Sequence, residues 1–214
     1  MWDFITQRRE EILFASWQHF SLVAQCLVLA TLLAVVIAAL VYRNATASGL
    51  ANGLSAMGLT IPSFALIGLL IAPFGFGVVP AVIVVTFFAT LPILRNAVVG
   101  LSGIPASVVE SARGIGMGRL RTLATVEIPM AWPVIMAGIR VSAQMVMGIA
   151  AVAAYTLGPG LGGFIFSGLS RLGGANAFES VVVGVVGVIV LAVVLDLVLV
   201  VIGRLTTSRG IRVR

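Results

Sequence analysis

The sequence predicts an all-α protein that crosses a membrane several times. Of its 214 residues, 60% are hydrophobic and 9% are charged, whereas a soluble globular domain usually carries about 25% charged residues. Apolar runs of roughly twenty residues recur along the chain, and each can cross a hydrocarbon core of ~30 Å at ~1.5 Å per residue. The length suits one compact helical bundle rather than several domains.

The composition also excludes several kinds of site. All 13 basic residues are arginine, so the chain lacks the lysine of a nucleotide-binding P-loop and any Schiff-base lysine. Cys26 and His19 are the only residues of their kinds, which leaves neither an internal disulfide nor a Cys/His metal cluster. The net charge of +6 comes from arginines dispersed over loops, which indicates the anionic inner leaflet rather than nucleic acid as the partner. We therefore expect neither a metal nor a cofactor.

Residues 1–19 mix polar and aromatic side chains and precede the first long apolar run. Trp2 and Trp17 suit the headgroup level of a bilayer, so the segment is interpreted as an interfacial lead-in helix. It is not predicted to be a signal peptide, because the run that follows is too long for such a peptide and no A-x-A-like cleavage site is present.

Five apolar runs are the predicted membrane spans. They lie at about 20–42, 51–72, 78–98, 132–156 and 180–203. Pro62 in the second run, and Pro80 and Pro92 in the third, predict bends that neighbouring helices line. Glycine and alanine are dense in the fourth and fifth runs, which predicts close helix packing.

The segment 157–179 between the last two spans is rich in glycine and too short to cross a bilayer. Gly158, Gly160, Gly162 and Gly163 suggest a flexible connection. Two interpretations stay open: a re-entrant or interfacial piece near the external mouth, or an ordinary surface loop.

The distribution of arginines predicts the orientation. If the segment 99–131 is cytoplasmic, nine arginines fall on the inside and only Arg8, Arg9 and Arg171 fall outside. The positive-inside rule then places the N-terminus outside and the C-terminus, with a basic tail at 205–214, in the cytoplasm. Arg8 and Arg9 are the discordant residues in this assignment.

The stretch 110–129, ESARGIGMGRLRTLATVEIP, is the most polar interval between apolar runs. Pro105 can open a helix, and Gly114, Gly116 and Gly118 then end it and allow a tight turn. A second helical stretch at 119–126 runs up to Pro129, where the fourth span follows. We expect two short helices that form a rigid knob in the cytoplasm. The glycines do not form a nucleotide-binding loop, because no strand precedes them.

The spacing of this stretch resembles the EAA loop of ABC importer permeases. Glu110, Ser111 and Ala112 are followed after three residues by Gly116, and after nine more by Val126 and then Pro129. The departures from the family pattern, serine at the second position, Val126 for isoleucine and Ile128 for leucine, are mild. The segments TIPSFALIGLLI (60–71), LPILRNAVVGLSGIP (91–105), VEIPMAWPVIMAGIR (126–140) and LGPGLGGFIFSGL (157–169) are similar to the permeases for glycine betaine, carnitine and choline uptake.

This resemblance implies a five-span core of the type I importer fold in a bacterial inner membrane. Two permease subunits, copies or paralogues, would pair, and each coupling loop would dock into one of two ABC ATPase subunits. An extracytoplasmic binding protein would deliver the solute. ATP hydrolysis would belong to the ATPase, so the chain itself is not expected to be an enzyme. The coupling-loop positions carried over are Glu110, Ser111, Ala112, Gly116, Val126 and Pro129.

Two ionisable residues lie inside predicted spans, where charges are costly and often functional. Arg140 and Asp196 fall at matching depths of two antiparallel spans, so we predict an ion pair that locks these spans, with a solute contact as the alternative. The span-facing aromatics Phe64, Phe87, Phe88 and Tyr155 could serve a quaternary ammonium, but their spacing does not predict a cage.

Other functions are weighed against this one. An ABC permease for another small solute, such as an amino acid, would carry a similar loop. A self-sufficient secondary transporter would require an intramembrane carboxylate relay or an inverted repeat, and the spans offer only Asp196. A membrane enzyme would need a nucleophile beside a base, and no such constellation is present.

Overall fold

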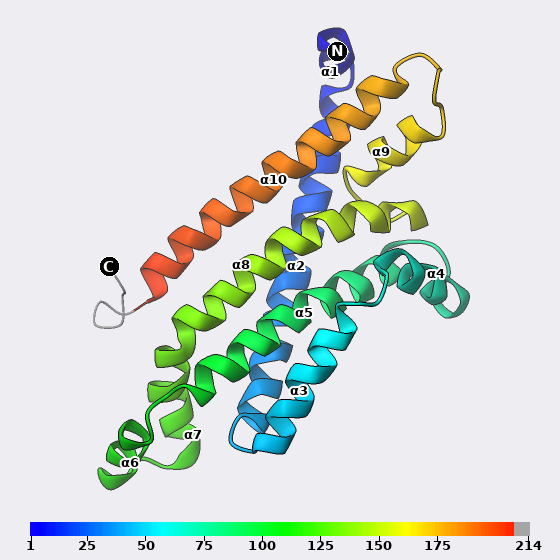
Figure 1. Ribbon diagram of the computed structural model, residues 1–214. Coiled ribbons are helices and arrows are strands. Elements are labelled where there is room, and N and C mark those ends of the chain that lie inside the picture. Colours follow the sequence, from blue (N-terminus) through cyan, green and yellow to red (C-terminus); the bar gives the residue numbers. More distant parts are fainter. Residues whose placement is uncertain (208–214) are drawn as a thin grey trace.

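The structure, a computed structural model, describes residues 1–207, and that part of the chain is built from helices alone (Figure 1). Four of them are long and apolar enough to cross a membrane, and a bent helix pair makes a fifth candidate. These elements are α2 (Arg9–Val41), the bent pair α3 (Ala45–Gly58) and α4 (Ser63–Phe74), α5 (Val78–Ser102), the helix Arg119–Thr156 that contains α8 (Ile128–Ala153), and α10 (Ala177–Thr206). The predicted fold class, an all-α polytopic membrane protein, is confirmed.

The first long helix begins earlier than the first apolar run. A short helix α1 (Trp2–Gln7) leads directly into α2, which is 33 residues long. At ~1.5 Å per residue α2 is about 50 Å long, more than a hydrocarbon core requires. No glycine or proline interrupts the chain between Arg9 and Val41, so most of the predicted lead-in segment 1–19 continues the same helix instead of forming a separate one.

The second predicted run, 51–72, is not one straight helix. α3 and α4 meet at an angle of 92°, and the break falls at Leu59–Pro62, between the two helices. Pro62 has an extended backbone with ψ of 119°, and proline also disfavours helical backbone at the residue before it. The bend expected at Pro62 is therefore large enough to turn the chain sideways.

The fourth predicted run continues into the polar loop without a break. α7 (Arg119–Thr122), a π-helical segment at Leu123–Glu127, α8 and a short 3₁₀ turn at Ala154–Thr156 form one helix of 38 residues. In the π segment the Ile128 N–H donates to the carbonyl of Leu123, five residues back. Pro129 follows directly and has no N–H to continue a regular ladder. The second helix of the predicted knob is thus an extension of α8.

The core forms around α5, which packs against α2 on one side and α8 on the other (Figure 1). Small residues allow these close approaches: Ala30, Ala34, Ala89 and Ala97 are completely buried. At Gly138 on α8, a Cβ atom would lie 2.7 Å from the Cβ of Asn96 on α5. The alanine- and glycine-rich composition of the spans is therefore used for helix packing.

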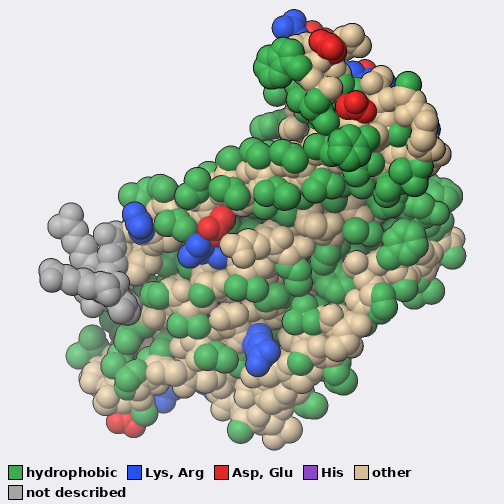
Figure 2. All heavy atoms as spheres, turned by 45° about the horizontal axis from the view of Figure 1, so that its top comes forward, with side chains coloured by type: hydrophobic (Ala, Val, Ile, Leu, Met, Phe, Trp, Pro, Cys, Tyr) green, Lys and Arg blue, Asp and Glu red, His purple; other side chains and the backbone are tan. Residues whose placement is uncertain are grey.

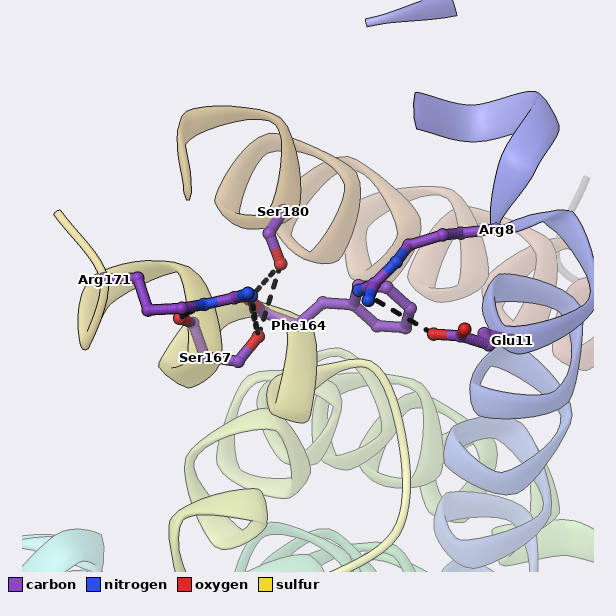
Figure 3. Close-up of polar contacts among 6 residues, drawn as sticks. All are labelled: Arg8, Glu11, Phe164, Ser167, Arg171 and Ser180. Atoms are coloured by element: carbon purple, nitrogen blue, oxygen red, sulfur yellow. Dashed lines mark hydrogen bonds and ion pairs between the residues drawn. The ribbon is translucent and has the colours of Figure 1, made fainter. Parts of the chain in front are cut away.

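The segment between α8 and α10 folds into α9 (Gly162–Leu169), which packs along the start of α10. Figure 3 shows this contact, where the Ser180 hydroxyl donates to the carbonyl of Phe164 at 2.8 Å. A Cβ on Gly162 would lie 2.0 Å from the carbonyl oxygen of Ala151. Gly160 combines φ of +117° with a close approach to His19. Three of the four glycines that suggested a flexible connection are instead sites of close contact, and only Gly163 has open space.

We predict that Gly162→Ala destabilises the protein by about 1–3 kcal/mol, because the added methyl group must displace the backbone of α8. Gly163→Ala is the matched control, since nothing lies within 4 Å of its added Cβ. Thermal unfolding in mild detergent, monitored by size-exclusion chromatography, measures the difference in stability between the two variants. Equal melting temperatures for the two variants would contradict the packing shown here.

Candidate functional site

The predicted coupling loop begins with α6 (Ala106–Gly114), at the end of the molecule opposite α1 and α9 (Figure 1). The helix ends in a Schellman motif, in which the Met117 N–H donates to the carbonyl of Ala112 at 3.1 Å and the Gly116 N–H donates to that of Arg113 at 2.9 Å. Gly116 has φ of +87°, a conformation that glycine adopts without steric cost. The motif turns the chain back toward α7.

The tip of this loop offers an exposed surface of mixed chemistry. Glu110 and Ser111 are exposed on α6, whereas Ala112 is buried against the protein. Two large apolar side chains are exposed close by, Ile115 at 76% and Leu120 at 82%. These side chains are free of contacts that would bury them and are accessible to a partner protein.

The other two predicted coupling positions lie at the base of the loop. Val126 is half-buried in the π-helical segment, and Pro129 is exposed at the first turn of α8. The structure thus brings Glu110, Ser111 and Ala112 together on α6 with Gly116 at its end, and separates them from Val126 and Pro129.

A buried carboxylate, which the sequence prediction did not single out, fixes the base of the loop to the end of α2. Glu127 is only 1% exposed, and its Oε1 accepts from the Arg43 guanidinium at 2.6 Å. Its other oxygen accepts from the Tyr42 hydroxyl, which in turn accepts from Arg43 Nε. Arg43 and Glu127 each border a predicted span on the same predicted side of the membrane. These positions could have indicated from the sequence that the two residues form an ion pair.

A cavity of about 290 Å³ separates α6 from this network. Glu110 and Arg113 line it from α6, and Tyr42, Arg43 and Glu127 line it from the end of the bundle. A hollow thus remains between α6 and the end of the bundle, although Ala112, Thr122 and Glu127 are buried.

The structure brings the two intramembrane charges together. Arg140 Nε and Nη2 donate to the two carboxylate oxygens of Asp196, at 2.8 and 2.9 Å, a bidentate geometry that favours a strong pair. The pair joins α8 to α10 and is partly open, with 42% of the Arg140 side chain and 22% of the Asp196 side chain exposed. Among residues 1–207, no three His, Cys, Asp or Glu side chains converge to hold a metal ion.

We predict that Asp196→Asn and Arg140→Gln each lower the stability of the protein by about 1–3 kcal/mol, because each leaves the other charge without its partner. The double variant should recover part of that loss. Thermal unfolding of the two singles and the double forms the test. Strictly additive losses would show that the pair contributes no coupling energy.

The exposed face of α8 differs in kind from those of its neighbours. It carries Ala137, Arg140, Gln144 and Gly148, with Val141 at its edge, and ends at Tyr155. The exposed faces of α2 and α10 carry large aliphatic residues such as Leu32, Val36, Ile189 and Val193. In Figure 2, adjoining acidic and basic side chains, and further separate basic ones, lie among the hydrophobic side chains of the face shown. Since charges and amides are costly against lipid tails, this face of α8 is suited to water or protein.

Comparison with known proteins shows which family the chain belongs to. Residues 30–208 match the family described as "Binding-protein-dependent transport system inner membrane component". The chain is 35% identical to the choline transport system permease protein OpuBB of Bacillus subtilis, over 98% of this chain and 95% of that protein. It is 38% identical to the osmoprotectant import permease protein OsmW of Salmonella typhimurium, over 92% of each.

The fold is also similar to a solved structure. A permease chain of the MetNI methionine ABC transporter in an inward-facing conformation superposes with a TM-score of 0.76, over 92% of this chain and 96% of that one, at 19% sequence identity. At that identity the likeness concerns the fold alone. The family match and the two relatives together show that the chain belongs to the binding-protein-dependent transport system inner membrane components, the multi-pass permease subunits of ABC importers.

Proposed function

We propose that this chain is the translocation subunit of an ABC importer for quaternary-ammonium compatible solutes such as glycine betaine, choline or carnitine. The observation that carries the proposal is the identity of 35% to 38% with osmoprotectant permeases over nearly the whole chain. A second such permease of Bacillus subtilis, named for glycine betaine, carnitine and choline, is 35% identical over 99% of this chain. The family description adds a binding protein to the system.

In this proposal α6 is the part that docks on the ATPase. Glu110 and Ser111, with the neighbouring apolar Ile115, supply the contact surface, and Gly116 sets the turn that presents it. Two ATPase subunits would each receive one knob from a pair of permeases, which are two copies of this chain or this chain and a paralogue. Val126 and Pro129 would serve at the base, where the movement enters α8.

The long helix Arg119–Thr156 supports a mechanical route for this coupling. Its cytoplasmic end belongs to the loop and its other end reaches α9, so a displacement of the loop moves the whole span. Closure of the ATPase pair around ATP would draw the two knobs together and re-aim the spans, which is an alternating-access change between two states.

The proposed orientation follows from the arginines. With α6 in the cytoplasm, the N-terminus and α9 lie outside and the end of α10 lies inside. Residues 208–214 of the predicted basic tail, 205–214, lie outside the described part of the chain. The predicted span limits, 20–42 through 180–203, belong to this proposal, since the helices themselves extend beyond several of them.

Uptake by the assembled importer tests the function. The importer is reconstituted in proteoliposomes from the chain, its ATPase, its partner permease and its binding protein. These proteoliposomes should accumulate labelled glycine betaine, choline or carnitine when ATP is supplied on the side of the membrane where the ATPase lies. Labelled methionine represents the alternative class of substrate, the amino acids. Accumulation of methionine without any of the quaternary ammonium solutes would replace the proposal with an amino-acid importer. Accumulation without ATP would indicate a secondary transporter.

A further inference from the structure

Three aromatic rings that are distant in the sequence meet at the outer end of the small and polar face of α8. The ring centroids of Phe64 and Tyr155 lie 4.9 Å apart, and those of Tyr155 and Phe166 lie 5.4 Å apart. The rings come from α4, from the 3₁₀ turn after α8 and from α9. Tyr155 and Phe64 are each about half exposed, at 52% and 50%, so the rings are not simply core packing.

A cavity of about 590 Å³, widely open to the surface, lies against two of these rings. Tyr155 and Phe166 line it together with Gly163, Ser167 and Ser170. Its volume falls within the range of small-molecule sites. Ala154, Leu157 and Leu169 complete the lining, which therefore combines ring and aliphatic surfaces with hydroxyl groups. The cavity lies where the exposed face of α8 ends, and that face is unsuited to lipid because it carries Arg140 and Gln144. A solute that follows this face therefore passes the rings.

The charge beside the cavity narrows the class of ligand. The Arg171 guanidinium donates to the carbonyl of Ser167 at 2.9 Å and lies 3.4 Å from its hydroxyl (Figure 3). Aromatic faces attract quaternary ammonium groups, whereas an arginine repels a bare cation and attracts a carboxylate. Rings in the lining, together with a guanidinium bonded to the lining residue Ser167, suit a ligand that carries both charges.

We propose that Tyr155 and Phe166, with Arg171 at the rim, form a solute site on the translocation path for betaine-type zwitterions. The rings hold the quaternary ammonium end, and Arg171 attracts the carboxylate end. Phe64 supports Tyr155 from the other side. The inference rests on the proposed function, since it specifies which of the quaternary ammonium solutes this permease favours and where it contacts them.

The test uses the assembled importer with Phe166 replaced by phenylalanine carrying one, two or three ring fluorines. Fluorine withdraws electron density from the ring face and hardly changes its shape, so each added fluorine should lower kcat/KM for glycine betaine further. Phe166→Leu should lower it about 3- to 30-fold. Phe178→Leu is the control, because that ring is exposed in the first turn of α10 and does not line the cavity. It should leave uptake unchanged.

The variant Arg171→Gln tests whether the site prefers the zwitterion glycine betaine to the cation choline. It should raise KM for glycine betaine by up to about 5-fold and leave KM for choline unchanged or lower. An equal effect on both solutes would overturn the assignment of a zwitterion. Uptake that is independent of fluorination would overturn the aromatic site while the proposed function stands. A wild-type importer that carries neither solute would overturn the site and the proposed function together.

Discussion

Replacing Arg43 with methionine should destabilise the protein by about 3 kcal/mol, because it leaves the buried Glu127 carboxylate without its counter-charge. The Arg43 side chain is itself 25% exposed, which places the loss at the lower end of the range for a broken buried pair. Glu127 is 1% exposed, and Arg43 is the cation that faces it, at 2.6 Å. The Tyr42 hydroxyl alone cannot neutralise the carboxylate. The melting temperature of the purified protein in detergent measures the loss.

The combined change Arg43→Met and Glu127→Gln should recover most of that stability, because it removes both charges and keeps an amide that the Tyr42 hydroxyl can bond. Arg113→Met is the matched control, since Arg113 lines the same cavity and is exposed. If Arg43→Met melted at the temperature of this control, the network would not hold the base of the loop.

Replacing Gly116 with valine should abolish coupled transport while the spans stay folded. A β-branched residue at φ of +87° is strongly disfavoured, and the strain of about 1–3 kcal/mol falls on the small loop rather than on the bundle. Since nothing lies within 4 Å of the added Cβ, the effect comes from the backbone and not from crowding. The measurement is solute-stimulated ATP hydrolysis by the assembled importer.

Gly118→Val is the matched control for that change. Gly118 has φ of −68° and equally open surroundings, so the same side chain fits there without strain at the backbone. Loss of coupling in both variants, or in neither, would contradict a specific role for the left-handed turn at Gly116.

Local patterns in the sequence predicted much of this architecture. Three of these patterns act through residues that are close in the sequence, so their structural effect can be predicted from the sequence. They are the apolar runs of spanning length, the proline at the α3–α4 bend and the polar stretch 110–129. The ion pair of Arg140 and Asp196 could also be anticipated, because two antiparallel spans place these residues at matching depth.

Other features that depend on tertiary contacts were not predicted. The aromatic cluster joins residues of α4 and α9 that no regular sequence spacing connects. The ion pair of Arg43 and Glu127 joins the ends of α2 and α8. The glycines at 158–162 suggested flexibility because composition alone does not distinguish a loose loop from a close approach. Gly162 could be understood only once the carbonyl of Ala151 was placed beside it.

Capture of the ATPase from native membranes tests the central claim most directly. A tagged chain, purified in mild detergent after crosslinking, should bring down an ATPase with Walker motifs, and Glu110→Arg should abolish this because it reverses the charge on the exposed face of α6. Glu179→Arg, a charge reversal in the first turn of α10, should leave capture intact. If the wild-type chain captures no such ATPase, or if Glu110→Arg captures as much as the wild type, α6 is not the coupling element.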